Sequence, residues 1–352
     1  MIAKIHLVNF RSFVSRTFSL SEKTTIIVGP NASGKTNILE SLFLLATGRS
    51  FRAKVEEEMI KYQEDLARVK AKTKENILEV ILTRGEIRVG EAKIEKVSRK
   101  KLILNGVPKR LIDYGEKTKV VLFGPWDLDL VTESPSVRRK FLDTVLSQAD
   151  REYKRALISY EKGLRQRNKL LFRIREEGLS RSQLLFWDQL LLKNGDYLSQ
   201  KRAKFLEFIN SSPEINGQKF RLEYDKSAIS DGRLEQYKEE EVAAATTLVG
   251  PHRDDFVFWT NGNGSERNLA TYGSRGEQRM SVLWLKLAEL AYIEKLVGEK
   301  PTLLLDDIFS ELDHKHREIV IAVCQNQQTV ITTADPHFVE NFVDVEIIRL
   351  GD

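Results

Sequence analysis

A short segment near the N-terminus has the residue types and spacing of a phosphate-binding loop. Gly29 and Gly34 would let the backbone curl so that its N–H groups point at phosphate oxygens. Lys35 would reach the β and γ phosphates, and the Thr36 hydroxyl would ligate Mg²⁺. The expected ligand is therefore a nucleoside triphosphate, together with Mg²⁺. The candidate binding residues are Gly29, Pro30, Asn31, Ala32, Ser33, Gly34, Lys35 and Thr36.

The segments on either side of this loop fit that chemistry. A strand must deliver the loop and a helix must follow it, because the helix N-terminus adds its positive end to the anion site. Residues 24–28 form a β-branched apolar run that predicts a buried strand. Residues 37–45 carry Ile38, Leu42 and Leu45 at helical spacing. This context favours a P-loop over a glycine-rich turn with no chemical role.

A second group of candidate residues lies late in the chain. The apolar residues 303–305 lead into Asp306 and Asp307, the Walker B pattern. The first carboxylate would hold Mg²⁺, and the second could polarise an attacking water. About thirty residues earlier, Ser274 and Gly276 open an amphipathic helix. A hydroxyl and backbone N–H groups at a helix N-terminus are suited to binding an anion.

The composition excludes several classes of protein. The chain has 352 residues, of which 41% are hydrophobic and 30% charged, as in soluble globular proteins of one large or two ordinary domains. The single cysteine, Cys324, excludes an intramolecular disulfide and a cysteine-based zinc site. No apolar run has the length of a signal peptide core or a membrane span. We therefore expect a cytoplasmic protein with no membrane partner.

The middle of the chain predicts a helical arm. Residues 137–210 contain no proline and show two long helical stripes separated near Gly178, which indicates an antiparallel pair. Residues 151–175 hold nine Lys or Arg against two Glu, an excess of +7 that exceeds the +5 of the whole chain. This concentration of charge favours nucleic acid over a merely solvated face. The candidate nucleic-acid-binding residues are Arg151, Lys154, Arg155, Lys162, Arg165, Arg167 and Lys169.

Two further stretches leave alternatives open. Residues 91–110 hold seven Lys or Arg against two Glu, and they lie either on a solvated sheet face or against nucleic acid. Within them, the dipeptide Asn105 and Gly106 predicts a hairpin turn. In residues 250–255, His252 and Arg253 either contact a ligand or shape a turn.

Taken together, these motifs resemble those of the RecF family, the short-armed relatives of the SMC and Rad50 ATPases that act in bacterial DNA gap repair. The resemblance extends over essentially the whole chain. It implies an α/β fold, an ABC-type P-loop ATPase head with a helical arm subdomain. The expected head is discontinuous, residues 1–125 and 245–352, with residues 126–244 as the inserted arm. The matching blocks are residues 9–13, 29–36, 48–52, 134–143, 250–255, 272–279 and 304–313.

The resemblance also assigns roles at the nucleotide. Asp306 is the Mg²⁺ carboxylate, and Asp307 takes the place of the catalytic glutamate of other ABC-type ATPases. Ser274, with Gly276 beside it, would serve the γ-phosphate bound to a second head, so the implied active form is an ATP-sandwiched homodimer. Arg11 is expected to contact the nucleotide, and Asp313 to lie in the loop across the dimer.

The chain departs from the ABC-type pattern in two places. No glutamine is evident for a Q-loop, and Thr332 and Thr333 stand where a switch histidine is usual. The γ-phosphate sensor is therefore left unassigned, whereas Lys35 and Asp307 stay as candidate catalytic residues beside Ser274.

The expected function is ATP-dependent DNA binding with weak ATPase activity at single-strand gaps and their junctions with duplex DNA. The ATP-bound dimer is expected to form a clamp around DNA, and slow hydrolysis to release it. The resemblance adds RecO and RecR as partners that help to place RecA. A transporter ATPase subunit is the alternative, but its arm would offer a membrane partner a groove rather than a basic face. An SMC-type tether would need hundreds of residues of heptad repeat, and a nuclease would need a second acidic cluster.

Overall fold

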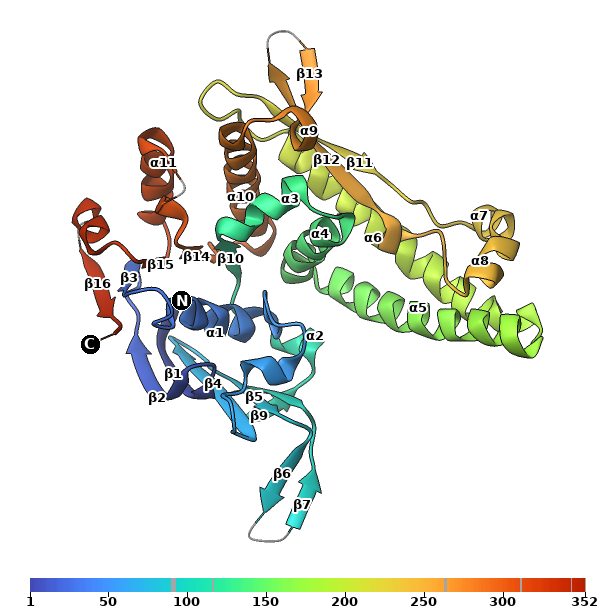
Figure 1. Cartoon of the computed structure of the whole chain (residues 1–352), viewed down its shortest axis with the longest axis horizontal. Helices are drawn as coiled ribbons and strands as arrows, with labels where there is room; N and C mark the ends of the chain where they lie inside the picture. The colour runs from blue at the N-terminus through green and yellow to red at the C-terminus, as the bar shows by residue number, and fades with distance from the viewer. Residues whose placement is uncertain (90–92, 116, 263–264, 311, 343, 352) are drawn as a thin grey trace. The chain divides into compact units, whose positions relative to one another are not determined.

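The computed structural model describes residues 1–89, 93–115, 117–262, 265–310, 312–342 and 344–351. The chain forms two compact units (Figure 1). The first unit comprises Met1–Pro125 with Gly298–Asp352, and the second comprises Trp126–Val297. Among the described residues, we find no helix long and apolar enough to cross a lipid bilayer.

A parallel sheet in the first unit carries the predicted P-loop strand. The strands β3, β14 and β15 are buried along their whole lengths, as expected for parallel strands with both faces covered. The buried strand predicted at residues 24–28 is confirmed. Because neighbouring strands run parallel, the loops that follow β3, β14 and β15 meet at one edge. The sheet order is β10 (Val120–Phe123), β14 (Thr302–Asp306), β15 (Thr329–Thr333), β3 (Thr24–Val28) and β16 (Val345–Arg349).

An antiparallel sheet forms the other layer of the first unit. Its strands alternate between buried and exposed residues, so one face packs on the core and the other meets solvent. The predicted turn at Asn105 and Gly106 is confirmed, with φ of 52° and 80°. The sheet order is β2 (Phe13–Ser19), β1 (Ile2–Phe10), β4 (Leu66–Thr73), β5 (Ile77–Thr83), β8 (Lys100–Leu104) and β9 (Val107–Lys109).

Helix α1 (Lys35–Thr47) packs against both sheets of the first unit. It contacts β10, β14 and β15 of the parallel sheet and β4 and β5 of the antiparallel sheet. A helix covered on two sides is apolar nearly all round, which explains the run of buried residues from Ile38 to Ala46. The helix ends at Gly48, whose φ of 71° closes the last turn. The unit also contains β6 (Glu86–Val89), β7 (Lys93–Lys96), α2 (Leu111–Tyr114) and α11 (His314–Cys324).

The second unit is built on the predicted antiparallel helical pair, which the structure confirms as α5 (Arg151–Glu177) and α6 (Leu185–Asn210). The Asp150 side chain caps α5 by accepting from the N–H groups of Glu152 and Tyr153. Gly178, with φ of 69°, ends it. The other elements are α3 (Asp129–Thr132), α4 (Pro135–Ala149), β11 (Phe220–Asp225), α7 (Asp231–Gln236), α8 (Lys238–Ala244), β12 (Asp255–Gly262), β13 (Ser265–Asn268), α9 (Leu269–Tyr272) and α10 (Arg275–Val297).

The boundary of the second unit differs from the one expected from sequence. Residues 245–297 group with the arm, and the chain returns to the first unit at Gly298. The reason is packing, since α10 contacts α3, α4 and α6, and β12 pairs with β11. The helix that opens with Ser274 is therefore part of the same compact unit as α5 and α6.

A buried arginine joins the helices of this unit to residues 250–255. Arg202 is 2% exposed and donates to Asp143 at 2.7 Å and to Asp254 at 2.9 Å. Its guanidinium also donates to the Pro251 carbonyl at 2.6 Å and to the Tyr153 hydroxyl at 3.0 Å. A buried charge is tolerated only when it is paired and hydrogen-bonded in this way.

Removing this arginine should destabilise the fold. We expect Arg202→Met to lower the free energy of unfolding by about 3–5 kcal/mol, because the fully buried Asp254 loses its cation. Urea unfolding measures the change. Arg221→Met is the control, since Arg221 pairs with Glu266 on an exposed surface and should cost about 0–1 kcal/mol. Equal losses in the two variants would contradict the role given to Arg202.

Candidate nucleotide site

The loop between β3 and α1 forms a tight backbone cradle that requires its glycines. Gly34 has φ of +99°, and a Cβ there would lie 2.9 Å from the Phe13 ring. A Cβ on Gly29 would lie 2.7 Å from the Leu350 carbonyl oxygen. The Ser33 Oγ is buried with no hydrogen-bond partner among the described residues. Since buried polar atoms are normally satisfied, this cradle fits an anionic group such as phosphate.

Lys35 lies against the same cradle. Its ammonium donates to the carbonyl oxygens of Gly29 at 2.7 Å and Pro30 at 3.0 Å, and the residue is 8% exposed. The cation is thus held within the loop by neutral acceptors that a phosphate oxygen could replace. The predicted role of Lys35 in phosphate binding fits this position.

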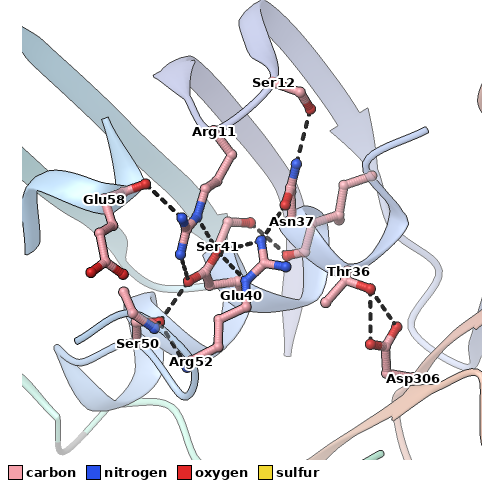
Figure 2. Close-up of polar contacts among 12 residues, drawn as sticks. Arg11, Ser12, Thr36, Asn37, Glu40, Ser41, Ser50, Arg52, Glu58 and Asp306 are labelled. Carbon is pink, nitrogen blue, oxygen red and sulfur yellow. Dashed lines mark hydrogen bonds and ion pairs between the residues drawn. The ribbon is translucent and has the colours of Figure 1, made fainter. Parts of the chain in front are cut away.

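Thr36 and Asp306 meet across the parallel sheet, although 270 positions separate them (Figure 2). The Thr36 hydroxyl donates to both carboxylate oxygens of Asp306, at 3.1 and 2.9 Å. Thr332, at the end of the intervening strand β15, donates to Asp306 Oδ1 at 2.5 Å. Hydroxyl and carboxylate oxygens are the hard ligands that suit Mg²⁺. The structure thus adds Thr332 to the candidate site, whereas in the sequence it stood out only as a departure from the ABC-type pattern.

Asp307 follows in a constrained turn. Its φ is 51°, a left-handed conformation that costs a non-glycine residue free energy unless the surroundings hold it. Its N–H donates to both the carbonyl and the hydroxyl of Thr332, each at 3.2 Å. Thr332 therefore positions both acids of the Walker B pair. The catalytic role of Asp307 stays a prediction.

Arg11 is anchored on a buried glutamate of α1 (Figure 2). Its Nε and Nη2 donate to the two Glu40 oxygens at 2.8 and 2.7 Å. Arg52 and Ser50 bind the same carboxylate, at 2.9 and 2.5 Å. Burial raises the pKa of Glu40, but the hydrogen bonds from Arg11, Arg52 and Ser50 outweigh it and hold that pKa below its usual range. An ionised Glu40 thus fixes two arginines from separate sequence blocks.

An open cavity of about 630 Å³ lies beside Arg11. Arg11 Nη1 donates to the Glu58 carbonyl at 2.6 Å on its wall, and the Asn37 amide donates to the Ser12 hydroxyl at 2.9 Å (Figure 2). Tyr62, which is 84% exposed, and Ile60 also line it. The predicted contact between Arg11 and the nucleotide stays a prediction. Glu40 was not among the predicted site residues, although a lone carboxylate within the apolar stretch of α1 is a signal that marks it.

The candidate signature residues lie in the second unit, and the P-loop lies in the first. The hydroxyl and N–H of Ser274 donate to Glu277 Oε2 at 2.9 and 2.8 Å, a capping box at the start of α10. Arg267 binds the other oxygen of Glu277. The hydrogen bond from the Ser274 N–H is the largest effect lowering the pKa of Glu277. A Cβ on Gly276 would meet no atom within 4 Å, so its backbone is open to a ligand.

Asp313 begins α11 as its N-cap. Its carboxylate accepts from the His316 N–H at 3.1 Å and lies 2.8 Å from the His316 ring. The side chain of Asp313 is 65% exposed, which leaves it accessible. Its position in a dimer stays a prediction.

The structure corrects two of the candidate DNA-binding residues. Arg167 is 1% exposed and pairs with Asp188 at 2.6 Å and Glu241 at 2.7 Å, so it cannot contact DNA. Lys154 is buried as well, at 8% exposure. The number of charges along the sequence does not reveal which side of α5 faces the protein. The candidates that are exposed are Arg151, Arg155, Lys162, Arg165 and Lys169.

The basic stretch at residues 91–110 is partly neutralised. Lys100 pairs with Glu56, and Arg99 pairs with Glu57 at 2.9 Å. Lys101 and Lys109 are exposed. Residues 91 and 92 lie outside the described part of the chain. The solvated and nucleic-acid interpretations of this stretch therefore both stand.

His252 shapes a turn. Its ring forms hydrogen bonds with the Tyr160 hydroxyl at 2.8 Å and the Thr247 carbonyl at 3.0 Å. Arg253 donates to the same carbonyl at 3.3 Å. Burial lowers the pKa of His252 from 6.5 to about 4, so the ring is neutral at pH 7. Of the two alternatives left by the sequence, the structural role accounts for both side chains.

Comparison with known proteins agrees with this geometry. The family model described as RecF/RecN/SMC N terminal domain matches residues 1–350. Two relatives named DNA replication and repair protein RecF come from Herpetosiphon aurantiacus and Lachnoclostridium phytofermentans. The first is 37% identical, covering 99% of this chain and 97% of the relative. The second is 34% identical with the same coverage.

Solved structures also show similarity to RecF. A recombination mediator protein RecF, solved as RecF-ATPrS in the RecFOR pathway, matches with a TM-score of 0.85 at 30% identity. The match covers 100% of this chain and 96% of that one. An Smc head bound to the C-winged helix domain of ScpA matches with a TM-score of 0.50 at 16% identity, over 98% and 93% of the two chains, which supports the fold alone. The expected fold class, an α/β ABC-type ATPase head, is confirmed.

The role of Thr332 can be tested through Mg²⁺. We expect Thr332→Val to weaken Mg²⁺-dependent ATP binding about 10–100-fold, because Asp306 loses the hydroxyl that orients it. Binding without Mg²⁺ should change little. Titration with a fluorescent ATP analogue, with and without Mg²⁺, measures both. Thr333→Val is the control, since the Thr333 hydroxyl accepts from the Asp335 N–H instead. The same Mg²⁺-specific loss in that variant would argue against the assignment.

The neutral His252 predicts a pH-dependent stability. As pH falls below 6.5, the unfolded chain protonates this ring, whereas the folded chain resists down to about pH 4. His252 should therefore remove about 3 kcal/mol of stability between pH 6.5 and 4, at 1.36 kcal/mol per unit of pKa shift.

Urea unfolding across this range should show a shallower pH dependence in His252→Gln than in the wild type. His337→Gln is the control, because His337 is 83% exposed. If His252→Gln followed the wild-type pH profile, the neutral, buried state of the ring would be disproved.

Proposed function

The chain belongs to the RecF family of DNA replication and repair proteins, and on this premise we propose that it binds ATP and, in that state, DNA at single-strand gaps. The observation that carries the proposal is the contact of Thr36 and Thr332 with Asp306 beside the glycine cradle. These groups are the donor set that a Mg²⁺-nucleotide requires. A relative of this chain has been solved as RecF-ATP.

Several residues would hold ATP and Mg²⁺. The N–H groups of the loop and the Lys35 ammonium would bind phosphate oxygens, while Thr36 and Asp306 would hold Mg²⁺. Mg²⁺, when bound, supplies neutralisation of the charge on the phosphates. Thr332 keeps Asp306 oriented through its 2.5 Å hydrogen bond. Asp307, held in its left-handed turn, would accept a proton from the attacking water and give the weak ATPase activity.

The open cavity beside Arg11 would take the base of the nucleotide. Asn37 is one of the residues that line this cavity, and it lies in the first turn of α1, directly after the phosphate-binding loop in the sequence. Tyr62 offers an exposed aromatic face, and Ile60 an apolar contact. Arg11, fixed by Glu40, would supply a rigid cation at the same wall.

Dimerisation would complete the nucleotide site. Ser274 belongs to a unit separate from the P-loop, and its hydroxyl and the open backbone at Gly276 would serve the γ-phosphate bound to a second copy. Asp313 would lie across that interface. ATP would hold the homodimer together, and hydrolysis would release it, because the dimer depends on contacts with the triphosphate.

The exposed basic residues of α5 would contact DNA. Arg151, Arg155, Lys162, Arg165 and Lys169 fall within an arc of about 80° at 3.6 residues per turn, so they form one stripe along the helix. Such a stripe binds the phosphate backbone, which makes affinity strongly dependent on salt and weakly dependent on sequence. RecO and RecR would act with this protein to place RecA.

The mass of the protein in solution tests the proposal. We compare the wild type with Lys35→Ala, with and without ATP and Mg²⁺, each in the presence and absence of gapped duplex DNA. The wild type should form dimers with ATP and retain DNA, and Lys35→Ala should stay monomeric because its P-loop lacks the ammonium.

Lys117→Ala serves as the control for loss of one exposed lysine and should behave as the wild type. A wild type that stays monomeric with ATP and ignores gapped DNA at low salt would refute the ATP-driven clamp.

A further inference from the structure

The outer face of the antiparallel sheet in the first unit carries a concentration of cations. Helix α1 packs on the opposite face, through β4 and β5. The alternation along each strand directs one set of side chains to solvent, because the intervening residues, such as Ile5 and Val69, are buried. This outer sheet face comprises Ser15, Thr17 and Ser19 of β2, Lys4, His6 and Val8 of β1, Arg68, Lys70 and Lys72 of β4, Ile77, Glu79 and Ile81 of β5, and Lys101 and Ile103 of β8.

The register of the strands brings like charges together. Lys4 of β1 lies directly opposite Lys72 of β4, and His6 lies opposite Lys70. Like charges in directly opposed positions destabilise a sheet. Two lysines could be avoided at these exposed positions without any loss of packing. Their presence indicates that the positive charge serves to bind an anionic ligand.

The outer sheet face has little internal compensation for this charge. Five of its residues are Lys or Arg, and Glu79 is its one carboxylate within the described part of the chain. Glu79 lies opposite Lys70 but forms its ion pair with Arg68, at 3.0 Å. Lys4, Lys70 and Lys72 are exposed and form no ion pair with any described residue. Three unpaired ammonium groups therefore project from adjacent strands.

We propose that the outer sheet face binds the phosphate backbone of duplex DNA. Neighbouring strands are about 4.8 Å apart and same-face residues about 7 Å apart along a strand, so Lys4, Lys70 and Lys72 form a compact cluster. Ammonium groups at this density meet a polyanion favourably, because each neutralised phosphate releases condensed counterions. The hydroxyls of Ser15 and Ser19 extend the surface with neutral phosphate-binding donors, whereas the Thr17 hydroxyl is hydrogen-bonded to the His6 ring at 2.8 Å.

The face suits duplex better than single-stranded DNA. Proteins that bind single strands add exposed aromatic side chains on which the bases stack. No Phe, Tyr or Trp belongs to the outer sheet face as defined by its described residues. A cationic surface without stacking groups contacts the phosphate backbone rather than the bases. This inference rests on the proposed function, and it adds a duplex surface on the head to the basic stripe of α5.

Salt titration of DNA affinity provides the test. The wild type and Lys70→Ala/Lys72→Ala are titrated with a blunt duplex and with a single strand of the same length, in ATP and Mg²⁺. Loss of two phosphate contacts should reduce the slope of log affinity against log salt by about 1.8 for the duplex, at 0.9 per contact. Affinity for the single strand should change little.

Two control variants separate charge from position and from folding. Lys117→Ala/Lys300→Ala removes the same charge from exposed sites elsewhere in the first unit and should keep the wild-type slope. Lys70→Arg/Lys72→Arg should also keep it. Thermal melting of Lys70→Ala/Lys72→Ala should be unchanged or higher, because the Lys4 and Lys72 repulsion is removed.

The outcomes distinguish this inference from the proposed function. If the wild type binds duplex DNA but Lys70→Ala/Lys72→Ala has the same slope, the outer sheet face does not bind DNA. If that variant instead loses binding to vesicles of anionic lipid while keeping its duplex slope, the face binds a lipid surface and the inference is overturned. If the wild type itself binds no DNA with ATP, the proposed function fails first.

Discussion

The contact between Thr36 and Asp306 is the interaction on which the candidate site depends. It joins the helix after β3 to the end of β14, two strands away in the sheet, and Thr332 reaches Asp306 from β15 between them. Three parallel strands must end at the same edge for these oxygens to meet. The long run of chain between β10 and β14 can form a separate unit because it only has to return β14 to its place beside β10.

Buried ion pairs hold several of the motif segments in place. Glu40 binds arginines from two loops that are far apart along the chain, and Arg202 binds carboxylates from α4 and from the turn before β12. Each cluster has several partners for one buried charge, which is the condition under which such a charge is tolerated. The motif blocks around Arg11, Arg52 and Asp254 thus contribute to the architecture through these charges.

The same chemistry explains why charge along the sequence is a weak guide to a binding surface. On α5, exposed basic residues share one side of the helix. Arg167 lies on the other side, where it is buried and forms ion pairs with Asp188 and Glu241. On the antiparallel sheet, lysines that are distant in sequence become neighbours through strand pairing. No charge run marks Lys4 and Lys72 as a pair. A surface of this kind emerges from register, which is set by the hydrophobic pattern of the opposite face.

The sequence by itself determined the features that depend on residues close together in the chain. The P-loop strand and its helix, the left-handed turns at Gly34 and Asn105, and the helical pair interrupted at Gly178 all follow from spacing and backbone preference. Thr36 and Asp306 could also be assigned to one site, because each stands in a motif whose chemistry requires the other.

Tertiary structure alone decided which distant groups became partners. The hydroxyl of Thr332 on Asp306, the two arginines on Glu40, the burial of Arg167 and the grouping of residues 245–297 with the arm leave no local signal. Each depends on how strands are ordered and which side of a helix is covered. These are properties of the whole packed chain, since the stabilising contacts form between segments that are far apart in the sequence.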